Sequence, residues 1–216
     1  MNDVIILGGT GYLGRPLIER LSAEGLRIVA VARPRSASKI PQGCRIIQGD
    51  ALDSRTYQHE IPRGAAFVHL VGVSKPSPWK AAQFRSIDLA SLEQSVAAAQ
   101  RAAADHFVYV SVAHPAPVMR AFIEVRIQCE QAIRASGLNA TILRPWYVLG
   151  PGHYWPYFLL PFYKVLEALP ATRPGAERLG LVTRAQMLDA LVEAVQSKPS
   201  GIRVLETAAI RSARSR

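Results

Sequence analysis

The chain opens with the stretch Val4-Ile5-Ile6-Leu7-Gly8-Gly9-Thr10-Gly11-Tyr12-Leu13-Gly14. A short apolar run precedes three glycines spaced G-x-x-G-x-x-G, and a sequence with helical periodicity follows them. This order is typical of a β-strand, a tight turn and a helix amino terminus, which together bind the phosphates of a dinucleotide. The context agrees, because Leu17, Ile18 and Leu21 lie at helical spacing and residues 26–31 form a second apolar run. The stretch therefore predicts a nucleotide-binding βαβ unit.

The glycine spacing has a physical explanation. Gly8 permits the sharp turn off the strand, Gly11 has no Cβ to keep a pyrophosphate from the backbone amides, and Gly14 lets the helix pack closely on the sheet. The helix amino terminus adds unpaired N–H groups and a partial positive charge. We therefore expect the turn to bind the cofactor through Gly8, Thr10, Gly11, Tyr12, Leu13 and Gly14.

The residues after the second predicted strand distinguish the two dinucleotides. An NAD site places Asp or Glu about 20 residues beyond the glycines, whereas an NADP site needs a cation for the 2′-phosphate. Arg33 occupies this position, Arg35 and Ser36 follow, and no carboxylate competes with them. Arginine binds phosphate through two hydrogen bonds, and Ser36 or Ser38 adds a donor. The sequence favours NADP(H), with NAD as the other cofactor considered and a solvated basic loop as the alternative.

Composition limits the class of protein. A chain of 216 residues with 49% hydrophobic content fits one α/β domain with a small appendage. The net charge of +10 is spread along the chain, which favours anionic ligands in general and gives no reason to expect nucleic-acid binding. Cys44 and Cys129 lack disulfide or metal-binding spacing, so we predict no metal, two buried inert thiols and a cytoplasmic location. We also expect no signal peptide and no transmembrane segment.

Apolar strands alternate with helices beyond the opening unit. We expect four more strands and two long helices, at residues 45–50, 66–72, 106–111 and 140–144 and at residues 81–104 and 117–136. This alternation predicts a Rossmann-like α/β fold, a doubly wound parallel sheet with helices on both faces. Ligands of such sheets bind at the carboxyl ends of the strands. Asp50, Gly72 and Ser111 should therefore lie near the glycine turn.

The chain divides into one main domain and smaller parts. We assign the dinucleotide-binding domain to residues 1–152, a small aromatic and proline-rich lid to 153–182, a helix and edge strand completing the domain to 183–207, and a frayed tail to 208–216. A capping-box pattern, Thr183-Arg184-Ala185-Gln186, opens the last helix. The aromatic segment 155–166 is expected to cover an apolar substrate, to meet a partner protein or a membrane interface, or simply to pack on its own domain.

These motifs together resemble the short-chain dehydrogenase/reductase superfamily, in its atypical branch beside the extended epimerase/dehydratase-like proteins. The resemblance covers residues 1–152 and rests on residues 8–14, Gly49-Asp50, Val110-Ser111, and Arg144-Pro145 through Gly150-Pro151-Gly152. It implies that Asp50 and Ala51 meet the adenine and that Val71 and Gly72 line the cofactor. It also implies that the backbone from Pro145 to Val148 approaches the nicotinamide.

The chain departs from this family at the catalytic residues. The family's reaction uses Ser or Thr after the fifth strand and the motif Y-x-x-x-K on the next helix. Ser111 takes the first place, but Phe122 and Arg126 take the places of Tyr and Lys. Phe122 has no hydroxyl, and Arg126 stays protonated. We expect Arg126 either to bind the nicotinamide ribose or a substrate anion, or to form a surface pair with Glu130.

Other residues are candidates for the missing proton donor. His114 follows Ser111 by three residues, and an imidazole titrates near pH 6.5, so it is a candidate catalytic residue, with an ordinary loop histidine as the alternative. Tyr147 and Tyr154 are expected to form an apolar pocket wall. His69 is expected in the core. For Asp88, a solvated and a cofactor-facing position stay open.

Two functional hypotheses follow from this pattern. The first is an NADP(H)-binding module, sensor or assembly protein, similar to non-catalytic relatives such as the nucleotide-binding accessory subunit of respiratory complex I. The alternative is an NADPH-dependent oxidoreductase or isomerase acting on an apolar carbonyl or quinone-like substrate. In that alternative Ser111 polarises the substrate oxygen, and His114 or water supplies the proton.

Overall fold

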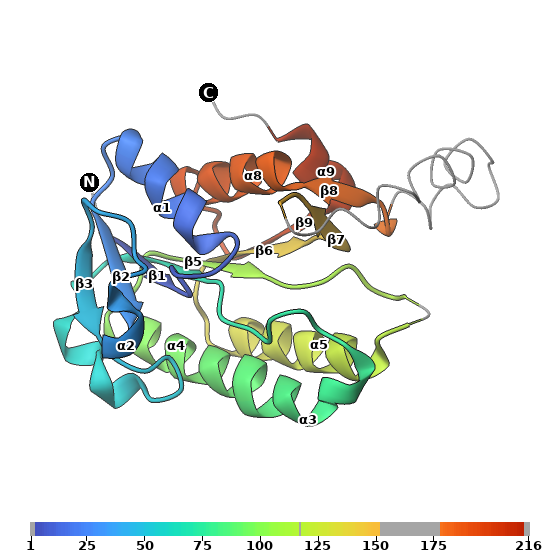
Figure 1. Ribbon diagram of the computed structural model, residues 1–216, viewed down its shortest axis with the longest axis horizontal. Helices are drawn as coiled ribbons and strands as arrows, with labels where there is room; N and C mark the ends of the chain where they lie inside the picture. The colour runs from blue at the N-terminus through green and yellow to red at the C-terminus, as the bar shows by residue number, and fades with distance from the viewer. Residues whose placement is uncertain (1–2, 117, 152–177, 214–216) are drawn as a thin grey trace.

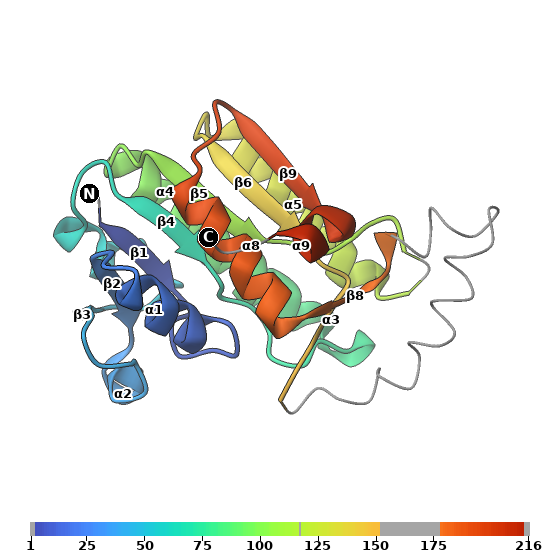
Figure 2. The same cartoon turned by 90° about the horizontal axis from the view of Figure 1, so that it is seen from above.

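A parallel sheet forms the centre of the computed structural model, which describes residues 3–116, 118–151 and 178–213. Its seven strands have the order β3-β2-β1-β4-β5-β6-β9, and every neighbouring pair is parallel. Their arrows point in one direction (Figure 2). The strands are β1 Val4–Leu7, β2 Ile28–Ala32, β3 Arg45–Gln48, β4 Ala66–His69, β5 His106–Val110, β6 Ala140–Arg144 and β9 Ile202–Glu206.

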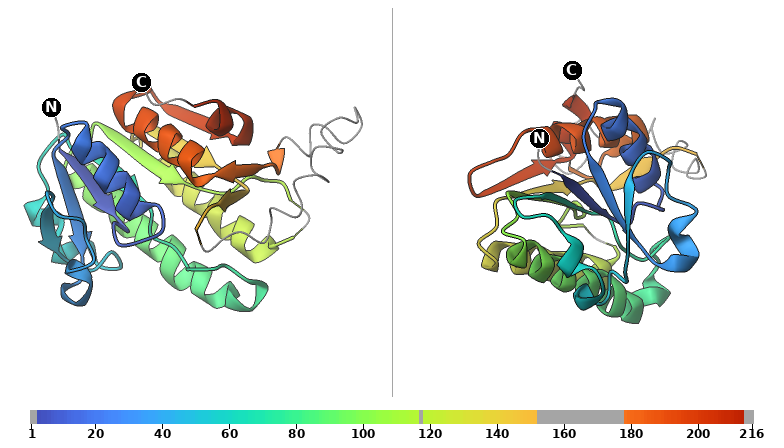
Figure 3. Two further views of the ribbon diagram at one scale, coloured as in Figure 1. Left: turned by 45° about the horizontal axis from the view of Figure 1, so that its top comes forward. Right: turned by 90° about the vertical axis from the view of Figure 1, so that its left-hand side faces the viewer.

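Helices cover both faces of this sheet. The main ones are α1 Gly14–Ala23, α4 Ala90–Arg101, α5 Arg120–Ala135 and α8 Arg184–Gln196, and the short ones are α2 Pro34–Ala37, α3 Ala81–Gln83 and α9 Thr207–Ser212. Helices α1, α8 and α9 lie on one face, with α4 and α5 on the other (Figure 1), and the right panel of Figure 3 shows the sheet between the two layers. The predicted doubly wound architecture is confirmed. Within the described ranges, no helix is long and apolar enough to cross a membrane.

Side chains of the opening strand explain why its sequence is continuously apolar. Val4 and Ile6 belong to the core cluster that contains residues of α1 and α8, whereas Ile5 and Leu7 belong to the cluster that contains residues of α4 and α5. All four are at most 2% exposed. A strand buried on both faces has no polar face, so it shows no alternation of apolar and polar residues.

The strand order reverses between β1 and β4, and this places the candidate site. Leu7 pairs with Val31 of β2 on one side and with His69 of β4 on the other, so the three strands end at the same level. Gly8 then passes so close to the loop after β4 that a Cβ on it would lie 2.7 Å from the carbonyl carbon of Leu70. Ligands of doubly wound sheets bind at this point of reversal.

The carboxy-terminal part confirms some predictions and corrects others. The capping box is present, because Thr183 Oγ1 accepts from the backbone N–H of Gln186 and the Thr183 N–H donates to the Gln186 side chain. Strand β9 is the predicted edge strand. The predicted frayed tail is wrong for residues 208–212, which lie in α9 and bury Ile210 completely.

Two further features differ from the sequence predictions. A small second parallel sheet joins β7 Tyr147–Leu149 to β8 Leu181–Thr183. The sequence analysis did not predict this sheet, because the many prolines between the two strands indicated irregular structure. Cys129 is buried as expected, but Cys44 is only half-buried. The aromatic segment 155–166, Tyr154 and most of the predicted lid lie outside the described residues.

Candidate functional site

A crevice runs along the carboxyl ends of the strands. A first cavity of about 350 Å³ lies beside β5 and β6, and a second of about 430 Å³ lies beside β1, β2 and β3. An open hollow of about 580 Å³ adjoins the second cavity. The first two cavities share Gly8, Gly11 and Gly72, so we treat all three as one crevice. We call the first cavity the β5 half, and the second cavity with its hollow the β2 half.

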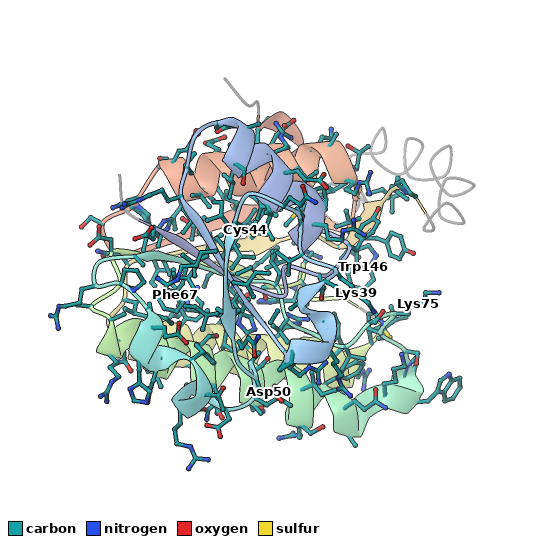
Figure 4. All side chains as sticks on the ribbon, turned by 60° about the vertical axis from the view of Figure 1, so that its left-hand side comes forward. Lys39, Cys44, Asp50, Phe67, Lys75 and Trp146 are labelled. Carbon is teal, nitrogen blue, oxygen red and sulfur yellow. The ribbon has the colours of Figure 1, made fainter. Side chains whose placement is uncertain are left out.

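Every residue predicted to bind the cofactor lines this crevice. Lys75 and Trp146, both labelled in Figure 4, also line the β5 half, and Asp50 lines the β2 half. The predicted residues are Gly8, Thr10, Gly11, Tyr12, Leu13, Gly14, Arg33, Arg35, Ser36, Asp50, Ala51, Val71, Gly72, Ser111, Arg126, Pro145 and Val148.

The glycine turn forms the shared wall of the two halves. The Gly11 N–H donates to the Gly8 carbonyl at 3.0 Å, and Gly8 has a φ of +88°, which favours glycine. A Cβ on Gly14 would lie 2.2 Å from the Gly8 oxygen, so a side chain has no room there. Helix α1 begins at Gly14, and its N-cap, Leu13, makes no side-chain capping bond. The N–H groups of this helix end therefore remain suited to phosphate oxygens.

The β2 half carries exposed cations. Arg33 directly follows β2, lies at the N-cap of α2 and is exposed, as is Arg35. The carboxylate that lines this half, Asp50, follows β3 instead of β2, and its Oδ1 accepts from the Leu52 N–H at 3.1 Å. The Thr56 hydroxyl oxygen accepts from the backbone N–H of Asp50 at 2.9 Å. In this half, hydrogen bonds therefore hold Asp50 in place, and two exposed arginines are available to bind a phosphate.

A buried ion pair lies under the loop between the two halves. Arg126 Nη2 is 2.6 Å from Asp88 Oδ1, and Asp88 Oδ2 accepts from the Val73 N–H at 2.9 Å. Asp88 is 1% exposed and lies in η4, a π-helical segment spanning Phe84–Leu89. The predicted surface pair between Arg126 and Glu130 is wrong, because Arg126 turns inward to Asp88.

Gly72 explains how Arg126 reaches the crevice. A Cβ on Gly72 would lie 2.7 Å from Arg126 Nη2 and 3.1 Å from Asp88 Oδ1, so a side chain here would displace the ion pair. Burial raises the pKa of Asp88, although Arg126 and the Val73 N–H oppose this. Burial opposes the charge of Arg126 as well, but Tyr109 and Asp88 outweigh it and raise the pKa of the guanidinium. Arg126 is therefore a fixed cation.

A second buried carboxylate, which the sequence analysis missed as a site residue, holds Ser111. Ser111 Oγ donates to Glu130 Oε1 at 2.7 Å, and Arg144 donates to both Glu130 oxygens. Burial favours a higher pKa for Glu130, but the hydrogen bonds from Arg144 and Ser111 outweigh it and lower the pKa. Arg144 also pairs with Glu206 at 2.8 Å. The helical spacing could have indicated that Glu130 faces the site, because Glu130 lies one turn beyond Arg126, which points inward.

His114 lies beside Glu130 and is not one of the residues that line the crevice. His114 Nε2 lies 3.5 Å from Glu130 Oε1, the atom that also accepts from Ser111, and His114 lines none of the three cavities of this crevice. Tyr147 does line the β5 half, together with the apolar residues Val112, Phe122 and Trp146. The predicted core position of His69 is confirmed: it is 1% exposed, and its Nδ1 lies 2.7 Å from Ser95 Oγ.

A family of known proteins matches most of this chain. The family model described as NAD(P)H-binding matches residues 8–152. "Ceramide reductase" of Caulobacter vibrioides is 28% identical over 151 residues, which are 69% of this chain and 47% of the relative. "3-diazoavenalumate denitrifying reductase" of a Streptomyces species is 25% identical, over 92% of this chain and 73% of the relative. "Photosystem II assembly factor Ycf39" of Cyanophora paradoxa is 24% identical, over 66% and 44%. The matched part is less than half of the first and third of these relatives.

Solved structures share the fold. The enzyme WbmH of Bordetella bronchiseptica, in complex with NAD⁺, gives a TM-score of 0.70 at 20% identity, over 95% of this chain and 76% of the other. UDP-glucose 4-epimerase of Thermus thermophilus, in complex with NAD, gives a TM-score of 0.65 at 17% identity, over 97% of this chain and 81% of the other.

The family match and the motifs agree with each other. The matched residues, 8–152, run from the glycine turn through the loop after β6, and they contain every residue that lines the crevice. The strand order and the position of the crevice are those expected from the motif resemblance. The chain therefore belongs to the NAD(P)H-binding family.

Proposed function

We propose that this chain is an NADP(H)-binding protein that works without the Tyr/Lys pair of its superfamily, as a nucleotide-binding, sensor or assembly module. One observation carries the proposal. An intact phosphate turn lies beside a β5 half in which Phe122 replaces the tyrosine, Arg126 is bound to Asp88, and Ser111 is bound to Glu130. Binding is thus supported more directly than acid/base catalysis. We also propose a cytoplasmic location, on the prediction from the cysteine spacing.

The preference for NADP(H) is part of the proposal. Arg33 and Arg35 line the β2 half at the end of β2, where a carboxylate would bind a ribose hydroxyl in an NAD site. Both arginines are exposed, so a phosphate can approach them without displacing a buried partner. Asp50 lies after β3, the position that the family resemblance gives to the adenine.

Calorimetric titration with NADPH and NADH tests the binding proposal. We expect NADPH to bind about ten-fold more tightly, since a charge-assisted pair contributes about 1.5 kcal/mol or more. Arg33→Ala should remove most of this difference. Arg45→Ala is the matched control, because Arg45 is exposed and pairs with Glu60 outside the crevice. Equal affinities for the two nucleotides would refute the preference, and no binding of either would refute the proposed function.

Reductase activity is the second candidate function. It is favoured by the apolar wall of Val112, Phe122 and Trp146 in the β5 half, a lining suited to an apolar substrate. Two of the relatives above are named as reductases, and a third is named as an assembly factor. The position of His114 gives no support to it as the proton donor.

Restoring the missing pair distinguishes the two candidates. We expect Phe122→Tyr with Arg126→Lys to give NADPH-dependent reduction of an apolar ketone such as acetophenone, from a parent protein that is silent, because the introduced hydroxyl supplies the donor that Ser111, bound to Glu130, lacks. Turnover already present in the parent, and abolished by Ser111→Ala or His114→Ala, would instead support the enzyme. Consumption of NADPH in the presence and absence of the ketone is the measurement.

A further inference from the structure

We propose that Glu130 fixes Ser111 as a hydrogen-bond acceptor, so that this point of the crevice takes a neutral N–H or O–H donor of its ligand instead of a carbonyl oxygen. The inference rests on the proposed function, because the ligand group belongs to the dinucleotide or to a molecule bound beside it. It reverses the role that the family resemblance implies for this serine, which is to donate to a substrate oxygen.

The direction of the Ser111 bond follows from the charge of its partner. An ionised carboxylate has no hydrogen and only accepts, so the 2.7 Å contact to Glu130 Oε1 uses the single proton of the serine hydroxyl. Arg144 keeps Glu130 ionised through bonds to both carboxylate oxygens, with Nε at 2.9 Å from Oε1. The Glu130 side chain is 4% exposed, so water competes little for the hydroxyl. Ser111 has only lone pairs left to offer a ligand.

Among the residues that the structure describes, the one at the position where the family places its tyrosine carries no hydrogen-bond donor. Phe122 occupies that position, and Val110 and Val112 flank Ser111 in the lining of the β5 half. Arg126 lines the same cavity, and its Nη1 donates to Tyr109 Oη and to the carbonyl of Val110, each at 3.0 Å. Arg126 Nη2 donates one of its two hydrogens to Asp88, and its second hydrogen can be donated to a ligand.

A primary carboxamide matches this arrangement of groups. Its N–H can donate to Ser111, and its oxygen can accept from the cationic Arg126, whose guanidinium already binds the residue next to Ser111. A ketone oxygen placed at Ser111 would instead face lone pairs with a carboxylate behind them. Both the nicotinamide carboxamide of the cofactor and an amide or alcohol ligand beside it carry the required donor.

Two pairs of probes test the donor requirement and identify its source. The first pair is NADP⁺ and its 3-acetylpyridine analogue, which differ only by NH₂ against CH₃. The second pair is benzamide and acetophenone, titrated with saturating NADP⁺ by ligand-detected NMR and differing in the same way. In the parent protein we expect the N–H compound of one pair to bind about five-fold more tightly, the value of one hydrogen bond.

Variants of the serine and the glutamate complete the experiment. Ser111→Ala should reduce the preference to about one-fold to two-fold, and Ser111→Thr, which keeps the hydroxyl, should retain it. Glu130→Gln should weaken the preference, because a neutral amide oxygen holds the Ser111 proton less strongly than a carboxylate does. Glu60→Gln removes an exposed carboxylate that also pairs with an arginine, and it is the control. Thermal unfolding checks that each variant is folded.

The outcomes separate this inference from the proposed function. If the N–H compound of the dinucleotide pair binds more tightly and Ser111→Ala reduces this preference, the hydrogen-bond donor belongs to the cofactor. If the preference is found only in the benzamide pair, the donor belongs to a second ligand. Ratios that are unchanged in both Ser111→Ala and Glu130→Gln, or a parent protein that favours the ketones, overturn the inference. If neither nucleotide binds, the proposed function fails, and the benzamide pair titrated without nucleotide still decides the inference.

Discussion

The two halves of the crevice differ in how their charged residues are held. In the β2 half, Arg33 and Arg35 are exposed, with Arg33 at the N-cap of α2 and Arg35 in its first turn. In the β5 half, Arg126 is buried and bound to Asp88, Tyr109 and Val110. Arg144, behind Ser111, is likewise bound to two glutamates. The β2 half thus keeps Arg33 and Arg35 available for a ligand, whereas Arg126 and Arg144 stabilise the structure of the β5 half itself.

This difference matters for the evolution of function on the fold. A phosphate site needs only exposed cations and free N–H groups, which a turn and a loop supply locally. A proton-transfer site needs groups that change their protonation state, and buried ion pairs suppress such changes. Four changes, each aimed at one feature of the comparison, test it from the largest expected effect to the smallest.

Breaking the buried pair of the β5 half should have the largest effect. Asp88→Ala leaves the Arg126 charge buried without its partner, which should lower the free energy of unfolding by about 3–5 kcal/mol. Urea-induced unfolding measures the change. Asp105→Ala is the control, because its pair with Lys198 is exposed and should contribute about 0.2–1 kcal/mol. Adding Arg126→Leu to Asp88→Ala should recover part of the stability, and a loss as small as the control's would contradict the difference between the halves.

Filling the shared wall should affect both halves at once. Gly14→Ala places a Cβ at 2.2 Å from the Gly8 oxygen, so the turn must shift. We expect a loss of about 2–3 kcal/mol in stability, as for overpacking, and a loss of NADPH affinity of more than ten-fold. Gly25→Ala is the control for the affinity: its φ of +77° strains an alanine and lowers stability as well, but its Cβ position is open and lies outside the crevice lining. Unchanged NADPH binding in Gly14→Ala by calorimetry would exclude the turn as the phosphate site.

Lowering the pH should destabilise the sheet beneath the crevice. Burial lowers the pKa of His69 to about 3 and that of His106 to about 4, from an ordinary value of 6.5. The unfolded chain therefore binds more protons below pH 6.5, so this stability is fully present above pH 6.5 and is lost as the pH falls. We expect each histidine to contribute a loss of about 2 kcal/mol between pH 6.5 and about pH 5.

Glutamine substitution isolates the contribution of one imidazole to this pH dependence. His69→Gln keeps a polar group near Ser95 but cannot be protonated in this range. Unfolding midpoints measured across the range should fall less steeply with decreasing pH in this variant than in the parent. An identical slope in the two proteins would mean that His69 does not couple folding to protonation.

Loosening the loop of the β5 half should have the smallest effect. Lys80 Nζ donates to the carbonyls of Ser74 and Lys75 at 2.6 and 3.1 Å, and both of these residues line the crevice. Lys80→Met should weaken NADPH binding about two- to three-fold, with a change in stability of about 0.5 kcal/mol or less. Lys198→Met, on the exposed ion pair with Asp105, should leave the affinity unchanged. A ten-fold loss of affinity would place this loop among the main determinants of binding.

Local sequence determined the fold class and the β2 half. Residues 4–14, the predicted strands and the Thr183 capping box each depend on neighbours within a few positions, and the structure contains all of them. The family match to residues 8–152 agrees with the motifs that pointed to a dinucleotide. Arg33 was found because it follows its strand directly, so a rule based on sequence distance is sufficient.

Only the tertiary structure decided the partners of the β5 half. Asp88 and Arg126 are separated by 38 positions, and Arg144 and Glu206 by 62, so no local pattern predicts these pairs. The sequence suggested Glu130 as the partner of Arg126 because the two are one helical turn apart. In the folded chain, Arg126 of α5 instead pairs with Asp88 of η4. Glu130 of α5 binds Ser111 and Arg144, which follow β5 and end β6. Buried charged groups cannot be solvated by water, so each one pairs with the opposite charge that the tertiary fold places next to it.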